Sequence, residues 1–168
     1  MMDGDIKNFF MKYFCVEEEQ VNKLLSTKTA TDFLLIWSIF EAKCFKGYCK
    51  EDLIKKCNYR FKDKHLETPF YEKVKEFHVR YQDKTTWKNL YYEKENSYFK
   101  DIRNKKYEEL DETEKNKFGL YVIFRFRNNI FHGNKKIESW LKYDEQIRNC
   151  ISMMLHIMTD KGIKVDAK

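Results

Sequence analysis

The residues best suited to chemistry lie near the end of the chain, where four positions separate an arginine from a histidine. The run from Arg127 to Gly133 reads Arg-Asn-Asn-Ile-Phe-His-Gly. An arginine binds phosphate through its planar fork and stays charged, and a histidine can exchange a proton near neutral pH. The amides of Asn128 and Asn129 can orient either group or a ribose. These residue types are the ones that metal-free cleavage of RNA requires.

The spacing alone is weak evidence, because the chain contains a second copy of it. Arg60 and His65 are also separated by four residues, in a polar stretch with no other distinguishing feature. The copy at Arg127 differs in two respects: a polar residue, Asn128, follows the arginine directly, and a strongly apolar segment, 118–126, precedes it. We therefore treat Arg127 and His132 as the candidate pair and Arg60 and His65 as a decoy.

Helical geometry limits how the candidate pair can act. Asn128 and His132 are four residues apart and share a helix face, whereas Arg127 and His132 lie about 140° apart around a straight helix. Convergence on one phosphate needs the helix to end at His132-Gly133, or a second copy of the motif from another chain. We therefore predict a homodimer joined near the 111–132 helix.

Plain structural roles compete with this interpretation. Arg127 and His132 would also suit a helix C-terminus, where cations stabilise the macrodipole and the free carbonyls. Glu41 lies within an apolar stripe, where an unpartnered carboxylate would be costly to bury. A buried ion pair with Arg125 or Arg127 is favoured for Glu41 over a catalytic role.

Composition predicts one all-α domain covering residues 1–168. One proline and five glycines in 168 residues, with 17% aromatics, fit a well-packed helical protein. The net charge of +6 suits a polyanion such as RNA, but the lysines are scattered along the chain. Five cysteines form no CxxC pair, and we expect no metal site and no cofactor. With neither a signal peptide nor a membrane span in the sequence, we expect a cytoplasmic protein.

Apolar periodicity predicts four or five antiparallel helices forming a bundle. The best-defined helices are expected at about 5–26, 31–45, 111–131 and 137–158. The helix at 31–45 is apolar on nearly all sides, which predicts a position at the centre. Asp111 and Glu114 form the capping box that opens the 111–131 helix. Short helices are expected at 51–57 and 70–81, split by Pro69, and 96–112 is expected to be a loop or weak helix.

The run from Arg127 to Gly133 resembles the signature of the HEPN superfamily, the higher eukaryotes and prokaryotes nucleotide-binding domains. The apolar helix containing residues 34–41 is also similar to a long helix in the first half of such domains. The resemblance implies a helical bundle, usually dimeric, whose paired motifs cut RNA without metal in toxin or anti-phage defence systems. It makes Arg127, His132 and Asn128 the catalytic residues, with Asn129 and Glu41 supporting them.

The resemblance has one departure. In a branch of these toxins a tyrosine two residues after the histidine is modified by a partner antitoxin, and this chain has Asn134 there. Regulation by that modification is not expected, although an antitoxin or regulatory protein remains a possible partner. The alternative function is a non-catalytic helical module that binds RNA, nucleotide or a protein.

Overall fold

The fold is helical in every regular element of the chain that the structure describes. The computed structural model describes residues 7–9, 11–12, 17–91, 94–131 and 141–160. Its elements are α2 (Glu18–Ser26), α3 (Thr29–Phe45), α4 (Glu51–Lys56), α5 (Lys64–Arg80), α6 (Lys84–Tyr91), α7 (Ser97–Asn104), the 3-10 turn η1 (Tyr107–Glu109), α8 (Glu112–Phe131) and α10 (Asp144–Thr159). The predicted all-α helical bundle is confirmed.

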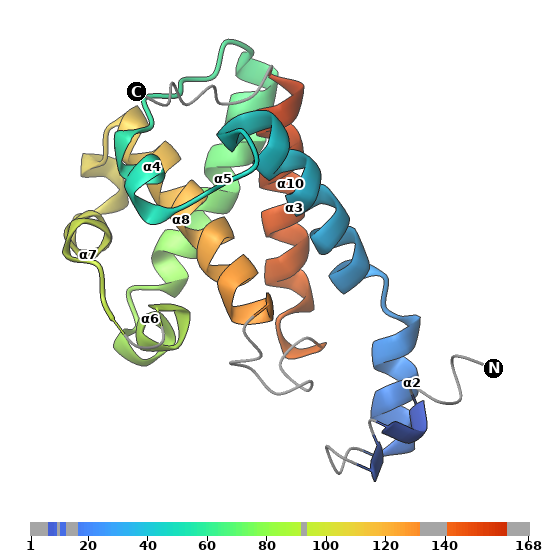
Figure 1. The fold of residues 1–168 in the computed structure, drawn as a ribbon. Helices are drawn as coiled ribbons and strands as arrows, with labels where there is room; N and C mark the ends of the chain where they lie inside the picture. The colour runs from blue at the N-terminus through green and yellow to red at the C-terminus, as the bar shows by residue number, and fades with distance from the viewer. Residues whose placement is uncertain (1–6, 10, 13–16, 92–93, 132–140, 161–168) are drawn as a thin grey trace.

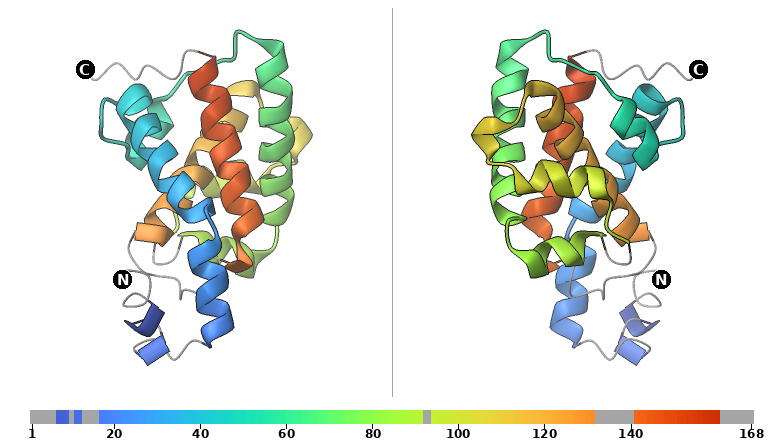
Figure 2. Two further views of the ribbon diagram at one scale, coloured as in Figure 1. Left: turned by 90° about the vertical axis from the view of Figure 1, so that its right-hand side faces the viewer. Right: turned by 90° about the vertical axis from the view of Figure 1, so that its left-hand side faces the viewer.

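Four long helices, α3, α5, α8 and α10, form the body of the molecule (Figures 1 and 2). Helices α3 and α10 run in one direction, and α5 and α8 run in the other. The predicted antiparallel order therefore holds between the two pairs, while the members of each pair run parallel. Parallel neighbours are possible because a long stretch of chain separates the members of each pair in the sequence. Residues 81–111 connect α5 to α8, and the elements from α4 to α8 lie between α3 and α10. Helix α2 projects beyond the end of this body (Figure 1).

Helix α8 is the centre of the bundle. It packs against α4, α5, α6, α7 and α10, and every side chain from Glu112 to Ile130 is buried or half-buried. Gly119 allows the close crossing with α5, because a Cβ there would lie 2.9 Å from Val74 Cγ2 and 3.0 Å from Phe70 Cζ. A glycine inside a helix costs about 1 kcal/mol relative to alanine, so its use here is explained by this packing.

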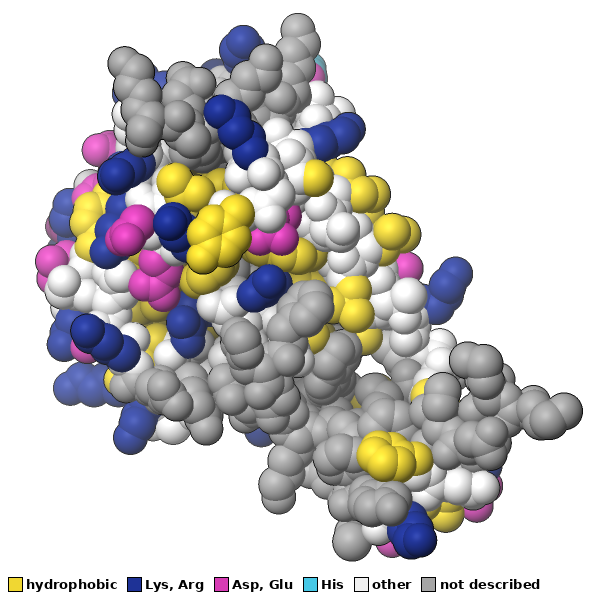
Figure 3. Space-filling model, in the orientation of Figure 1, with side chains coloured by type: hydrophobic (Ala, Val, Ile, Leu, Met, Phe, Trp, Pro, Cys, Tyr) yellow, Lys and Arg dark blue, Asp and Glu magenta, His cyan; other side chains and the backbone are white. Residues whose placement is uncertain are grey.

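The predicted central position of the 31–45 helix is wrong. Helix α3 buries Phe33, Trp37 and Phe40 against its neighbours, but Leu35 is 59% exposed and Ile39 is 39% exposed. Apolar side chains accordingly line the outer side of α3 in the space-filling view (Figure 3). The same view shows lysines and arginines dispersed among acidic side chains, as the scattered lysines of the sequence predicted.

The bounds of α8 and α3 are close to those predicted, and the capping box is confirmed. The Glu114 N–H donates to Asp111 Oδ1 (2.8 Å), and the Asp111 N–H donates to Glu114 Oε2 (3.2 Å). The predicted break at Pro69 is wrong, because α5 begins at Lys64 and includes this proline. The missing proline N–H would otherwise bond the His65 carbonyl, which lies at the exposed start of the helix.

Other expected elements differ from the structure. The predicted 5–26 helix is interrupted at Glu17, which is not helical. Within the predicted 137–158 helix, residues 141–142 are helical and a turn at Tyr143 separates them from α10, while 132–140 lie outside the described residues. The chain from 84 to 109 forms α6, α7 and η1. Buried Trp87 and Phe99 account for these short helices, since both side chains pack into the aromatic core around Tyr121.

Asp160 ties the end of α10 to the segment before α5. Its carboxylate accepts hydrogen bonds from the Tyr59 hydroxyl, from the Lys62 N–H (3.0 Å) and from the Asp63 N–H (3.0 Å). Burial acts to raise the pKa of Asp160, but these donors together lower it below its usual value. Helices α10 and α5 are thereby joined where one ends and the other begins.

Candidate functional site

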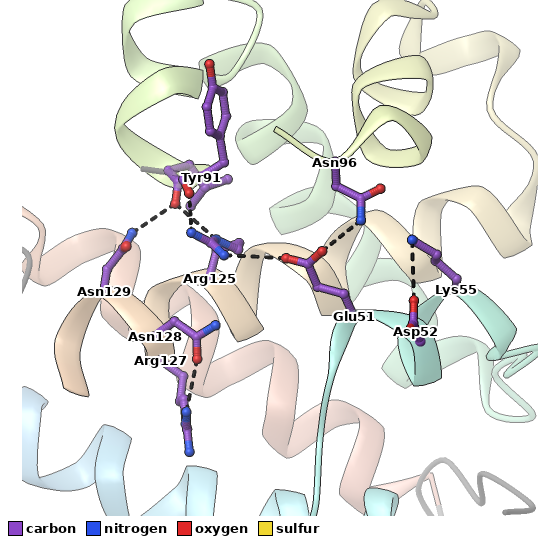
Figure 4. A network of polar contacts seen from close by, with 10 residues as sticks. Glu51, Asp52, Lys55, Tyr91, Asn96, Arg125, Arg127, Asn128 and Asn129 are labelled. Atoms are coloured by element: carbon purple, nitrogen blue, oxygen red, sulfur yellow. Dashed lines mark hydrogen bonds and ion pairs between the residues drawn. The ribbon is translucent and has the colours of Figure 1, made fainter. Parts of the chain in front are cut away.

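The last turns of α8 carry the candidate residues on two opposite faces. Arg125 and Arg127 are two residues apart, which places them about 200° apart around the helix. Arg125 and Asn129 lie toward α6, Arg127 lies on the other side, and Asn128 lies between Arg125 and Arg127 (Figure 4). The two faces have different partners and are described in turn.

Arg125 joins three segments of the chain. Its Nε donates to the Leu90 carbonyl (3.2 Å), its Nη2 donates to the Tyr91 carbonyl, and its Nη1 lies 3.4 Å from Glu51 Oε1 (Figure 4). Glu51 in turn accepts from Asn96 Nδ2 (2.7 Å). Leu90 and Tyr91 end α6, where carbonyls lack helical donors, so Arg125 acts there as a cationic cap.

Asn129 belongs to the same structural network. Its side chain is 3% exposed, and its Nδ2 donates to the Leu90 carbonyl (3.1 Å), which Arg125 also contacts. Its contacts therefore position the end of α8 against α6. The predicted supporting role of Asn129 remains a prediction, in which it would act by positioning.

Arg127 and Asn128 contact one another on the opposite face. Arg127 Nη1 donates to Asn128 Oδ1 (3.0 Å; Figure 4). The guanidinium carbon lies 5.7 Å from the centre of the Trp37 ring of α3. A cation over a tryptophan ring is stabilised by the ring's quadrupole. Arg127 is thus held by α3 and by its own neighbour.

Glu41 does not form the predicted ion pair. Its Oε2 accepts from the Trp37 indole N–H (3.2 Å) and its Oε1 accepts from the Cys49 N–H (2.9 Å). Arg125 pairs with Glu51 instead, and among the residues that the structure describes Glu41 has no cationic nitrogen within 4 Å. Two N–H donors satisfy the carboxylate, and Trp37 contacts both Glu41 and Arg127.

The buried thiol of Cys49 lies within reach of both charges. Burial raises its pKa well above the ordinary value, Glu41 adds to the rise, and Arg127 opposes it. A thiol with a raised pKa stays protonated at neutral pH and is a poor nucleophile. Cysteine chemistry is therefore not indicated here, and in the described ranges no three His, Cys, Asp or Glu side chains are grouped to hold a metal.

His132, the predicted proton-transfer residue, lies outside the described residues, which end on this side at Phe131. The decoy histidine, His65, is exposed in the first turn of α5, where its backbone N–H donates to Asp63 Oδ1 (2.8 Å). His78 is buried, and its desolvation lowers its pKa. His156 lies 3.3 Å from the Ser152 hydroxyl, and burial lowers its pKa too. His78 is thus a core residue and His156 is half-buried.

Sequence reasoning missed two features of the site. Trp37 was not singled out, although its spacing of four residues from Glu41 places both on one helix face. The Arg125 network was also missed, because its carbonyl partners at Leu90 and Tyr91 carry no side-chain signal. Arg103 repeats the same arrangement, donating from Nε to the Tyr81 carbonyl (2.6 Å) and from Nη2 to the Gln82 carbonyl at the end of α5.

Neither a family model nor any curated protein or solved structure matches this chain. The HEPN resemblance therefore stays a prediction resting on the run from Arg127 to Gly133. Across the described ranges, no helix combines the length and apolarity needed to cross a bilayer.

Proposed function

We propose that the protein is a metal-independent endoribonuclease that acts as a dimer. One observation carries the proposal: the guanidinium of Arg127 lies over the Trp37 ring and beside Asn128, while Arg125, on the same helix, contacts helix-end carbonyls and Glu51. Arg127 is therefore positioned by two neighbours in the segment that also contains His132.

The proposed reaction uses the RNA's own 2′-hydroxyl as nucleophile. One histidine accepts the proton of that hydroxyl, and the 2′-oxygen forms a bond to phosphorus. The bond from phosphorus to the 5′-oxygen breaks, and an acid protonates the leaving oxygen. Arg127 stabilises the charge that develops on the phosphate, with Asn128 orienting its guanidinium. The products are a 2′,3′-cyclic phosphate and a 5′-hydroxyl, so DNA is no substrate.

The base and the acid come from two copies of His132, which explains the dimer. The side chains of α8 from Glu112 to Ile130 are buried or half-buried within one chain, so the predicted seam near this helix would use its end. In the proposal the copies meet at the end of α8 and along the outer side of α3, where Leu35 and Ile39 are exposed.

A cytoplasmic toxin or anti-phage defence role follows from this activity, because uncontrolled RNA cleavage would damage the cell. An antitoxin or regulatory protein would then restrain the enzyme. The second candidate is a non-catalytic module that binds RNA, nucleotide or a protein partner. It is favoured by the fact that the described half of the site, Arg127 on Trp37 beside Asn128, is suited to holding an anion and contains no proton-transfer group.

The proposal is tested with end-labelled single-stranded RNA and the matching DNA, incubated with the purified chain in excess EDTA. We expect RNA to be cut to 2′,3′-cyclic phosphate ends and DNA to remain intact. The cutting activity should sediment at the mass of two chains. A requirement for divalent metal, or equal cutting of DNA, would rule out this mechanism, and binding of RNA without cleavage would favour the non-catalytic module.

A further inference from the structure

The loop between α3 and α4, residues 46–50, is built rigidly beside the Arg127 face. Lys46 adopts a left-handed conformation (φ 55°), as does Gly47 (φ 85°), and the N–H groups of both contact the Glu41 carbonyl. Left-handed backbone is unfavourable for a residue with a Cβ, so the loop is held by these bonds. The Cys49 side chain is buried, and its N–H donates to the Glu41 carboxylate (2.9 Å).

An exposed aromatic ring stands on this loop. Tyr48 is 64% exposed, the highest exposure of any large apolar side chain in the described residues. The Lys50 ammonium lies 5.1 Å from the centre of its ring, and Lys46 is also exposed. A mostly exposed ring with a lysine on either side in the sequence has the chemistry that single-stranded nucleic acid binds: a stacking surface for a base and cations for its phosphates.

The loop and Arg127 share one support. Glu41 binds the loop through the Cys49 N–H and binds the Trp37 indole with its other oxygen, and Trp37 carries the guanidinium of Arg127. The influence of Arg127 on the Cys49 thiol is consistent with this proximity. A strand whose phosphate contacts Arg127 could therefore place a neighbouring base on Tyr48.

We infer that Tyr48, with Lys46 and Lys50, forms a subsite for an unpaired RNA base and its phosphates next to the phosphate that Arg127 binds. This inference rests on the proposed function and adds a substrate class to it: single-stranded RNA, because bases stacked within a duplex do not offer a free face. Glu41 is the positioning residue that holds the loop and Trp37 together.

The test uses the full chain carrying His132→Ala, so that RNA binds without being cut, and measures fluorescence anisotropy with a labelled single-stranded RNA and its duplex. We expect the single strand to bind more tightly than the duplex. Tyr48→Ala should weaken binding of the single strand by roughly 10- to 100-fold, and Tyr48→Phe should restore it. Lys50→Ala should reduce the slope of log K against log salt by about 0.7. Val79→Ala, an exposed apolar residue on α5, is the surface control and should have no effect.

Two results separate the failure of the subsite from the failure of the function. Suppose that the unmodified chain cuts RNA, but that Tyr48→Ala in the His132→Ala chain binds the single strand as tightly as His132→Ala alone. The subsite is then wrong and the proposed function stands. If the parent chain neither cuts nor binds RNA, both are wrong. Circular dichroism of each variant should match the parent, because the Tyr48 ring and the Lys50 side chain are exposed.

Discussion

Arg125 and Arg127 lie two residues apart on one helix, yet their surroundings assign them different tasks. Arg125 contacts two carbonyls at the end of α6 and the carboxylate of Glu51, and its side chain is only 14% exposed. The guanidinium of Arg127 lies over the Trp37 ring and contacts Asn128. The first arginine completes hydrogen bonding that α6 cannot complete itself, so its removal should damage the fold.

The comparison teaches that partners, not residue type or spacing, distinguish a structural arginine from a candidate binding residue. Arg103 supports this conclusion, because it contacts the Tyr81 and Gln82 carbonyls at the end of α5 as Arg125 contacts those of α6. Between them the two arginines fix the ends of consecutive helices. Arg127 instead contacts the Trp37 ring of α3 and the amide of Asn128, and this setting beside the candidate motif is the reason for assigning it to the proposed site.

The largest expected effect is on stability, from replacing Arg125. Arg125→Met keeps the length of the side chain but leaves two buried carbonyls and Glu51 without this donor, which should lower the free energy of unfolding by about 3 kcal/mol. Arg103→Met should behave similarly. Arg127→Met should lose about 1 kcal/mol or less, the value of a cation on a ring. Urea unfolding followed by circular dichroism measures all three, and equal losses at Arg125 and Arg127 would contradict the comparison.

A smaller effect is expected from Asp160, which belongs to the structural side of the comparison. Its folded pKa is lowered, so its stabilising contribution is complete above the ordinary value of about 3.9 and is lost as pH falls through the folded pKa. Asp160→Asn should cost about 1–2 kcal/mol at neutral pH, and its stability should fall less steeply than that of the parent below about pH 4. If the free energy of unfolding fell with pH equally steeply in the parent and in Asp160→Asn, the Asp160 carboxylate would not stabilise the fold in this way. Arg127→Met should leave this pH dependence unchanged.

Local signals were predictable from the sequence because they depend on neighbouring residues. Asp111 and Glu114 form the predicted capping box, since a helix start is decided within four residues. The end of α3 at Phe45 was predicted for a similar reason. The break expected at Pro69 failed because the packing of Phe70 and Val74 outweighs the single backbone bond that the proline removes.

Placement was not predictable, because it depends on which surfaces remain after the helices pack. Helix α3 lies at the surface of the bundle although it is apolar on nearly all sides. Helix α8 occupies the centre although its first turns carry more charge. For the candidate site, the sequence located Arg127 and Asn128 at the end of a helix but assigned Glu41 the wrong partner. The donor from Cys49 is a backbone N–H in a loop, and no side-chain pattern encodes it.

The most direct test of the central claim compares RNA cleavage by variants that stay folded. Rates should be measured in EDTA for the parent, Arg127→Met, His132→Ala and the decoy variant His65→Ala, each checked by circular dichroism. We predict that Arg127→Met is about 100- to 1,000-fold slower, that His132→Ala is about 100- to 10,000-fold slower, and that His65→Ala stays within a few-fold of the parent. Unchanged cleavage by folded Arg127→Met, or loss of cleavage in His65→Ala, would contradict the account.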